Sequence, residues 1–358
     1  MRGARFCSLA DARTKSAHIP VLLKEVIEIL NPKLGPACRQ AGNFFIDGTV
    51  GSAGHTASIL EKMMPRGKFL ALDWDKKLLE KAKKEIEAKF QIPPKENLRL
   101  PTGQANSKFQ IFWVNDNYAN LPEILKDLQG KKLEKADGLL LDLGFSSDQL
   151  EKSGRGFSFL RDEPLDMRYN ITQTNADDTQ INAEKSQRES AFSPRESAAA
   201  VINNRREKEL ADIIYKYGEE RFSRRIAKKI VEERKRKPIK TTFDLVEIIR
   251  KAVPKSYERG RLHPATRTFQ ALRIYVNNEL GNLSKILSNL ADILKSKGRV
   301  VIISYHSLED RIVKQQFKLL EKEGKAKILT KKPIRPTFQE IQINPRSRSA
   351  KLRAIILN

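Results

Sequence analysis

Four short apolar runs along the chain predict the buried parallel strands of an α/β sheet. They lie at Phe44–Asp47, Lys68–Asp73, Gly138–Leu143 and Arg299–Ser304. Segments of helical composition, His55–Met64 and Asp75–Phe90, follow the first two runs. This alternation of strand and helix is typical of a doubly wound α/β fold.

The pattern changes after residue 150, where the strand runs stop until residue 299. Residues 170–197 are polar and aperiodic, which predicts a linker, whereas residues 207–253 have helical spacing throughout. A long helix is expected from Ala265 to Lys297, and Gly281 could break it into two. The expected organisation is therefore an α/β domain in two parts, 18–150 and 263–358, a helical insertion at 151–262 that includes the linker, and a disordered start at 1–17.

The balance of charge points to a polyanionic partner. The 358 residues include 68 Lys and Arg against 44 Asp and Glu, a formal charge of +24, which suits nucleic acid or an acidic membrane surface. No apolar run approaches the ~18 residues of a membrane-spanning helix, so an integral membrane protein is excluded. Only Cys7 and Cys38 are present, too few for a disulfide framework or a zinc site, which favours the reducing cytoplasm. The first 17 residues lack the apolar stretch of a secretory signal, although a weak organelle-import sequence stays open.

A glycine loop follows the first predicted strand in the segment FIDGTVGSAGH (45–55). Its glycines, Gly48, Gly51 and Gly54, allow a tight turn against a ligand, and the helix that follows offers unpaired N–H groups. The spacing differs from the dinucleotide motif G-x-G-x-x-G. Asp73 ends the second strand, where a carboxylate commonly accepts hydrogen bonds from ribose hydroxyls. Together they predict an adenosine-containing cofactor, either a nicotinamide or S-adenosylmethionine; the alternative for Asp73 is a cap of the next helix.

The third predicted strand favours S-adenosylmethionine. It ends at Asp142, and Gly144 and the hydroxyl of Ser146 follow it. In methyltransferases that act on exocyclic amines, a polar cluster at this position meets the target amine, which the residues position for attack on a methyl group. Asp142 could instead be a structural turn residue.

At this point the residues resemble the ribosomal RNA small subunit methyltransferase H family, also called the MraW family. The resemblance runs from residue 18 to the end. It includes HIPVLLKEV (18–26), FIDGTVGSAGH (45–55), DLGFSSDQL (142–150), GRGFSFLRDEPLDMR (154–168), YGEERFSRRIAKKIV (217–231), HPATRTFQALRIYVNNEL (263–280), SYHSLEDRIVK (304–314) and NPRSRSAKLRA (344–354). It implies a Rossmann-like class I methyltransferase sheet interrupted by a helical domain that recognises substrate. The implied activity transfers a methyl group from S-adenosylmethionine to N4 of a cytidine in the decoding region of small-subunit 16S rRNA, on the small ribosomal subunit.

The resemblance also implies a cofactor site. Its residues are Ala53, Gly54, His55, Asp73, Tyr118, Asp142 and Gln149. The family usually has glycine where Ala53 stands. Residues 97–112 are expected to be an extra surface segment, and the linker at 170–197 is longer than the family's usual connection.

Two further groups are functional hypotheses. His306, just after the last predicted strand, is a candidate catalytic residue together with Asp142 and Ser146, and its alternative role is a structural histidine. A basic stretch is a candidate RNA-binding surface, with a solvated helix face as the alternative. Its residues are Arg221, Arg224, Arg225, Lys228 and Lys229, and Arg346, Arg348, Lys351 and Arg353 form a second basic group near the C-terminus.

The sequence shows no ligand cluster that suggests a metal, and we expect none. An NAD-dependent oxidoreductase, a non-catalytic ribosome-assembly factor with the same fold, and a methyltransferase acting on amines of DNA or another RNA remain alternatives. Nicotinamide binding would identify the first, and a methylation assay would separate the second.

Overall fold

The computed structural model describes residues 19–32, 43–90, 109–128, 133–170, 196–258 and 262–358. Within these residues lies a seven-stranded sheet of order β3-β2-β1-β4-β5-β7-β6, in which only β7 runs antiparallel to its neighbours. The strands are β1 (Phe44–Asp47), β2 (Gly67–Asp73), β3 (Phe109–Asn115), β4 (Ala136–Asp142), β5 (Leu294–Ser304), β6 (Ala326–Ile328) and β7 (Lys351–Leu357). This order is that of a Rossmann-like class I methyltransferase sheet, so the expected fold class is confirmed.

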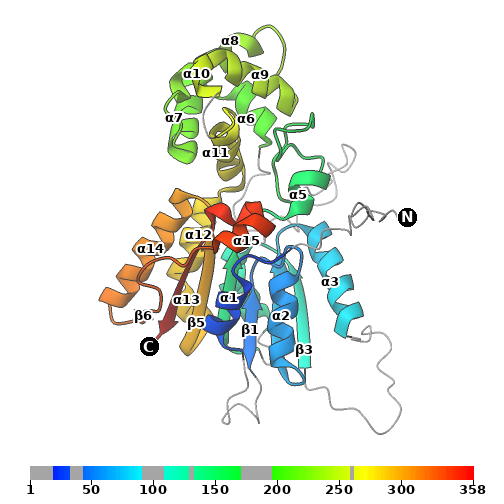
Figure 1. Cartoon of the computed structure of the whole chain (residues 1–358), viewed down its shortest axis with the longest axis vertical. Helices are drawn as coiled ribbons and strands as arrows, with labels where there is room; N and C mark the ends of the chain where they lie inside the picture. Colours follow the sequence, from blue (N-terminus) through cyan, green and yellow to red (C-terminus); the bar gives the residue numbers. More distant parts are fainter. Residues whose placement is uncertain (1–18, 33–42, 91–108, 129–132, 171–195, 259–261) are drawn as a thin grey trace, which may run out of the picture.

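Helices cover both faces of the sheet (Figure 1). Those that follow or precede the strands are α1 (Leu23–Leu30), α2 (Gly54–Met63), α3 (Lys76–Phe90), α4 (Leu121–Leu128), α12 (Glu279–Ser288), α13 (Leu290–Ile293), α14 (Ser307–Lys322) and α15 (Phe338–Ile343). Short 3₁₀ helices occupy Tyr118–Asn120 and Pro345–Ser349. No described helix is long and apolar enough to cross a membrane.

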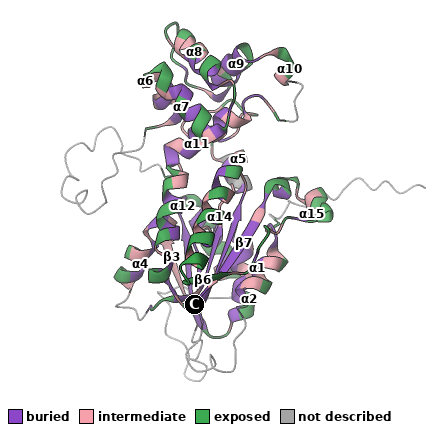
Figure 2. Ribbon diagram, turned by 90° about the vertical axis from the view of Figure 1, so that its left-hand side faces the viewer, coloured by how far each residue is buried: buried purple, intermediate pink, exposed green. Residues whose placement is uncertain are grey.

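Two cores explain why the central strands are apolar throughout. Leu139 and Leu141 of β4 pack into one core with α12 and α14, whereas Leu140 packs into the other with α1 and α2. Successive side chains of a strand point to opposite faces, and both faces here are covered. Figure 2 shows the buried strands between more exposed helices.

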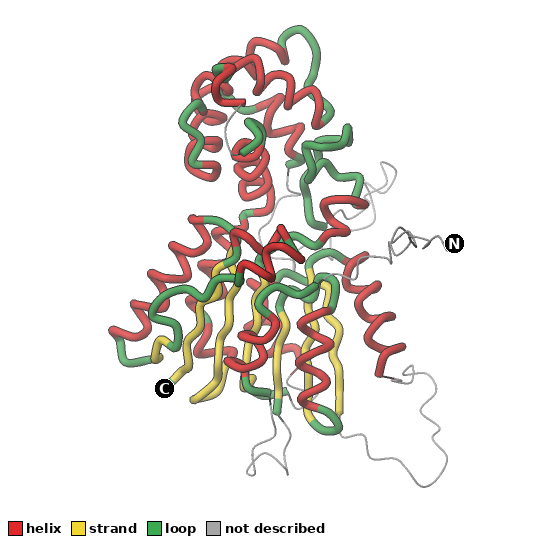
Figure 3. Tube along the Cα trace, in the orientation of Figure 1, coloured by secondary structure: helices red, strands yellow, loops and turns green. Residues whose placement is uncertain are grey.

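A third core belongs to the helices at one end of the sheet (Figures 1 and 3). The helices are α5 (Ser147–Lys152), α6 (Ala198–Asn204), α7 (Glu207–Gly218), α8 (Ser223–Arg234), α9 (Thr242–Ala252), α10 (Lys255–Glu258) and α11 (Thr266–Asn277). Phe269, Leu272 and Val276 of α11 are part of this core. The core of the helical part therefore continues past the expected boundary at residue 262.

The helix expected over Ala265–Lys297 does break into two, but not at Gly281, and it ends before Lys297. Asn278 has φ +48 and separates α11 from α12, and Leu294 already begins β5. Asparagine tolerates this left-handed conformation better than most residues do. The side-chain amide of the preceding Asn277 donates a 2.7 Å hydrogen bond to the carbonyl of Met167, whereas Gly281 lies within α12.

The extra segment expected at 97–112 needs a second correction. Its last residues, from Phe109, belong to edge strand β3, which pairs with β2 along its whole length. This strand contains the apolar run Ile111–Val114, which is typical of a buried strand rather than of an extra surface segment. Residues 97–108 lie outside the described part of the chain, as do 1–17 and residues 171–195 of the linker.

Candidate active site

The carboxyl ends of β1, β2 and β4 bring three aspartates to one edge of the sheet. Asp47 is buried and accepts hydrogen bonds from the hydroxyl of Thr56 at 2.7 Å and the backbone N–H of Thr49 at 3.0 Å. Burial raises the pKa of Asp47. These bonds tie both ends of the glycine loop to β1, so Asp47 is a loop-holding residue that the sequence analysis did not single out.

Asp73 holds the middle of the same loop. One carboxylate oxygen accepts the N–H of Gly51 and the other accepts the N–H of Asp75, both at 2.8 Å. Burial, opposed by these two hydrogen bonds, raises the pKa of Asp73 to about 7. Asp73 does not cap α3, because Asp75 stands directly before Lys76 and accepts the N–H of Lys77 at 3.1 Å. Asp73 instead holds the loop and lines a cavity.

That cavity is the smaller of two that meet at the strand ends. It has a volume of about 90 Å³, and it brings together four of the predicted cofactor residues, namely Asp73, Tyr118, Asp142 and Gln149. Gln149 is fixed by a capping box with Ser146, in which each backbone N–H donates to the other's side chain.

The larger cavity, about 270 Å³, is lined by the predicted residues Gly54, His55, Asp142 and Ser146. Both cavities share Thr49, Gly51, Asp142, Gly144 and Ser146 as lining residues. Ala53 lines neither; it is buried, caps α2 and has φ +60. A left-handed conformation at this position explains why a glycine suits it better.

Asp142 lies in the shared wall with well-defined partners. The hydroxyl of Tyr305 donates to its Oδ1 at 2.9 Å, and its backbone N–H donates to the hydroxyl of Thr49 at 2.6 Å. His55 Nδ1 lies 3.5 Å from Oδ2, while His55 Nε2 lies 2.9 Å from the carbonyl of Val21. One oxygen of Asp142 is thus fixed by a phenol and the other faces an imidazole.

Tyr305 was missed in the sequence, although it stands next to the predicted His306. A Cβ at Gly144 would lie 2.4 Å from its ring, so glycine is required for the ring to pack here. Burial, then the charge of Asp142, raises the pKa of Tyr305 well above its ordinary value. Its phenol therefore stays a hydrogen-bond donor at neutral pH.

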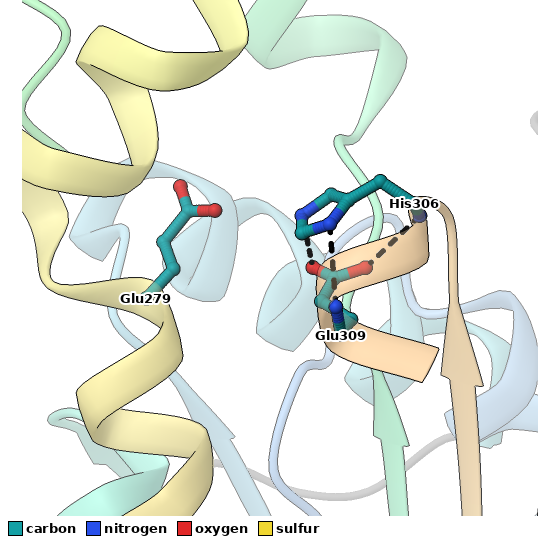
Figure 4. A group of neighbouring side chains, drawn as sticks. All are labelled: Glu279, His306 and Glu309. Atoms are coloured by element: carbon teal, nitrogen blue, oxygen red, sulfur yellow. Dashed lines mark hydrogen bonds and ion pairs between the residues drawn. The ribbon is translucent and has the colours of Figure 1, made fainter. Parts of the chain in front are cut away.

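His306 lies at the same edge of the sheet, as expected, but it lines neither cavity. It is the N-cap of α14: Nδ1 accepts the N–H of Glu309 at 3.3 Å, and Nε2 lies 3.1 Å from a carboxylate oxygen of the same residue (Figure 4). Burial disfavours the charge of Glu309, but the charges of His306 and Arg273 hold the pKa of Glu309 below its ordinary value.

Glu279 faces His306 and Glu309 across a short gap, and the three offer atoms within 4.8 Å of one another, as a metal site requires (Figure 4). However, the guanidinium of Arg273 contacts both carboxylate oxygens of Glu279 at 2.8 and 2.9 Å, and Tyr169 donates to one of them at 2.9 Å. The guanidinium of Arg273 is therefore already the cation bound to Glu279. The absence of a metal remains a prediction.

The segment 154–168 links the helical part to the cofactor side. Arg155 forms an ion pair with Asp75 and donates to the carbonyls of Arg168 and Tyr169. The Tyr169 ring lies 5.7 Å from that of Trp74, and both rings line the smaller cavity. The helical insertion thus contributes directly to one wall of the site.

The predicted RNA-binding residues lie on or just before α8. Ile226 and Ile230 are buried, whereas Arg221, Arg224, Arg225 and Lys228 are exposed. Lys229 differs, because it forms ion pairs with Glu232 and Glu233 at 3.1 Å. The guanidinium of Arg221 lies over the rings of Phe222 and Tyr257, at 4.8 and 5.1 Å, which holds it at the surface.

The second basic group near the C-terminus does not form one surface. Lys351 and Arg353 both pair with Asp310, at 3.0 and 2.6 Å, and Arg353 is buried. Residues two apart in a strand share a face, so both side chains lie on the side of β7 where Asp310 of α14 is placed. Arg346 and Arg348, in the 3₁₀ turn before β7, remain exposed.

The model of the MraW methylase family matches residues 15–357. A ribosomal RNA small subunit methyltransferase H of Syntrophus aciditrophicus is 42% identical over 94% of this chain and 96% of its own, and one of Clostridium botulinum is 42% identical over 94% and 97%. Among solved structures, an rRNA methylase from Streptococcus thermophilus covers 95% of this chain and 99% of its own at 10% identity, with a TM-score of 0.38, a likeness too low to carry an argument.

Proposed function

Because the chain belongs to the MraW methylase family, we propose that it transfers a methyl group from S-adenosylmethionine to N4 of a cytidine in the decoding region of small-subunit 16S rRNA. The observation that carries the proposal is the meeting of two cavities at Asp142. A transfer between two bound molecules requires their reacting atoms to lie about 3–3.5 Å apart, which two adjoining cavities with shared lining residues allow. The names of the 42% identical relatives support the small-subunit rRNA as substrate.

The residues of the smaller cavity fit the adenosine part of the donor. Asp73 offers a buried carboxylate to ribose hydroxyls, and the Tyr118 ring and Gln149 are suited to the base. The turn that contains Gly54 and His55 begins α2 and is suited to the amino-acid part. When bound, S-adenosylmethionine supplies an electrophilic methyl group on a sulfonium sulfur, which keeps the bonding electrons when the methyl is transferred.

Asp142 is the residue we assign to the target amine. The lone pair of N4 forms the new N–C bond while the C–S bond breaks, and the nitrogen must then lose a proton. Asp142 accepts an N–H of the amine and is the nearest carboxylate in the shared wall to receive that proton. Tyr305 and Thr49 hold Asp142 in place, and the hydroxyl of Ser146 lies in the same wall.

His306 enters this scheme as a positioning residue. It lines neither cavity and holds Glu309, whose second oxygen accepts the backbone N–H of Tyr305 at 2.9 Å. In this way His306 fixes the strand end from which Tyr305 reaches Asp142. A direct contact between His306 and the base is not required.

Binding of the substrate is assigned to the exposed basic residues at α8. Arg221, Arg224, Arg225 and Lys228 suit the phosphates of rRNA, and Lys229 suits them once released from its glutamates. A cytosine amine that pairs or stacks must be extruded or come from a single strand to reach the site. The partner is then the small ribosomal subunit, and the place of action the cytoplasm.

The test is mass spectrometry of small-subunit rRNA from cells with and without the protein. We expect one cytidine of the decoding region to lose its N4-methyl group when the protein is absent. Unchanged methylation of that rRNA would contradict the proposal. A change at another amine would keep the chemistry and correct the substrate.

A further inference from the structure

We propose that the larger cavity receives the target pyrimidine nucleotide and that Arg346, released from Glu151, binds a phosphate of the same RNA strand. This inference rests on the proposed function and deepens it. It adds a nucleotide site in the α/β part of the chain to the basic surface at α8.

The assignment of the cavity follows from the common wall. Asp73, Tyr118 and Gln149 line only the smaller cavity, so the nucleoside part of the donor belongs there. The acceptor must then approach Asp142 from the other side, through the larger cavity. That cavity is the larger of the two, about 270 against 90 Å³, and it also contains Gly54 and His55, the residues suited to the amino-acid end of the donor.

The outer wall of this cavity has the character of a base-contact surface. Ile19 and Ile343 line it, and they are 46% and 69% exposed. Both side chains are large and apolar, and they offer an apolar surface to the face of an unstacked base. Asn344 is also in the lining; its amide nitrogen donates to the carbonyl of Ile19 at 3.1 Å, and its amide oxygen is an acceptor that a base edge can use.

Arg346 and Glu151 both line this cavity, and they come from two different parts of the chain. Glu151 comes from α5, after β4, and Arg346 from the 3₁₀ turn before β7; the two side chains form an ion pair. They remain 47% and 45% exposed. An exposed pair of this kind contributes little to stability, so exchanging Glu151 for another anion costs little.

A phosphodiester is the anion that fits the exchange. The planar guanidinium of an arginine can bind two oxygens of a phosphate just as it binds the two oxygens of a carboxylate. Entry of a nucleotide would bring a phosphate to the cavity mouth where Glu151 now lies. Glu151 would then act as a counter-charge that keeps Arg346 oriented until RNA arrives.

Three variants test this with small subunits isolated from cells that lack the protein. Arg346→Ala removes the proposed contact, Arg346→Lys keeps only the charge, and Glu151→Gln releases the arginine. Arg311→Ala is the matched control, because Arg311 forms an ion pair of similar exposure with Glu219 and lines neither cavity. The measurements are subunit binding across a salt series with S-adenosylhomocysteine present, methyl transfer, calorimetric affinity for S-adenosylhomocysteine, and thermal melting.

Arg346→Ala should raise KM for the subunit by about tenfold and reduce the slope of log affinity against log salt by about 0.7, with affinity for S-adenosylhomocysteine unchanged. Arg346→Lys should have a KM between those of Arg346→Ala and the parent. Glu151→Gln should bind subunits more tightly than the parent does. The inference is wrong if Arg346→Ala changes KM and the salt slope no more than Arg311→Ala does. It is also wrong if Arg346→Ala binds subunits more weakly only because its melting temperature has fallen, while Arg346→Lys binds them as the parent does. Absence of any transfer by the parent protein would instead count against the proposed function, and the binding series would still decide the role of Arg346.

Discussion

The phenol of Tyr305 donates a 2.9 Å hydrogen bond to Oδ1 of Asp142, in the wall shared by the two cavities. A hydrogen bond to a charged group contributes roughly 1.5–3 kcal/mol, and this one orients the carboxylate assigned to the target amine. Tyr305→Phe should therefore lower kcat by about 10–100-fold while affinity for S-adenosylhomocysteine changes little. Tyr215→Phe, on an exposed tyrosine of α7, is the control. An unchanged kcat for Tyr305→Phe would remove Tyr305 from the mechanism.

The pH dependence of donor binding should report on Asp73. Its pKa is raised to about 7, chiefly by burial, so the carboxyl ionises as pH rises through neutrality. The ionised form is the better acceptor for ribose hydroxyls. Affinity for S-adenosylhomocysteine should therefore increase about tenfold from pH 6 to pH 8.

Calorimetry with Asp73→Asn checks the assignment. This variant should bind about 10–100-fold more weakly at pH 8, because it loses hydrogen bonds to a charged acceptor, and its affinity should no longer vary over this pH range. The same pH dependence in the variant and the parent would show that another group titrates.

Ala53 should be a point of backbone strain. Its φ of +60 costs an L-residue roughly 1–2 kcal/mol, part of which glycine recovers. Ala53→Gly should raise the free energy of unfolding by about 0.5–1 kcal/mol, measured by denaturant titration. Ala57→Gly, in the right-handed interior of α2, should lower it by a similar amount. Destabilisation by both changes would show that position 53 is not strained.

Two variants can separate the helix-capping role of His306 from a requirement for its imidazole in methyl transfer. Asparagine is a good N-cap, so His306→Asn should keep the melting temperature of the parent and most of its turnover. His306→Ala should lose about 1 kcal/mol of stability with the cap. Turnover lost in His306→Asn at unchanged stability and unchanged donor affinity would show that transfer requires the imidazole itself and not only the helix cap.

The basic surface at α8 should determine the salt dependence of RNA binding. Replacing both Arg224 and Lys228 by alanine should reduce the salt slope by about 1.4, that is about 0.7 for each lost phosphate contact. Lys318 and Lys322, exposed on α14, make a matched double variant with the same loss of charge. Equal slopes for the two double variants would favour a solvated helix face.

The sequence was most informative where one local signal decided the structure. Central strands such as Phe44–Asp47 are buried on both faces, so their apolar runs identified them, and Asp73 and Asp142 followed as the strand ends. Edge strand β3 also has an apolar run, Ile111–Val114, but only its pairing with β2 shows that the run belongs to the sheet. At the break between α11 and α12, Asn277 bonds to Met167, 110 residues away in sequence. Such contacts are set by tertiary packing and leave no local pattern.

The same distinction explains the site. Residues of the glycine loop and the strand ends could be predicted because their types and spacing are chemical requirements of the ligand. Tyr305 and the Arg346–Glu151 pair could not, since each depends on which segments meet across the cavities. The sequence placed His306 at the correct edge of the sheet. The residue whose side chain reaches Asp142 is its neighbour Tyr305, and the direction of a side chain could not be read from the sequence.

The most direct test of the account is transfer in vitro. Purified protein, S-adenosylmethionine labelled on its methyl group and small subunits lacking the modification are incubated together, and the rRNA is digested to nucleosides. The account predicts label in N4-methylcytidine from the decoding region, with little from Asp142→Asn under the same conditions. Label in any other nucleoside, or equal transfer by Asp142→Asn, would contradict it.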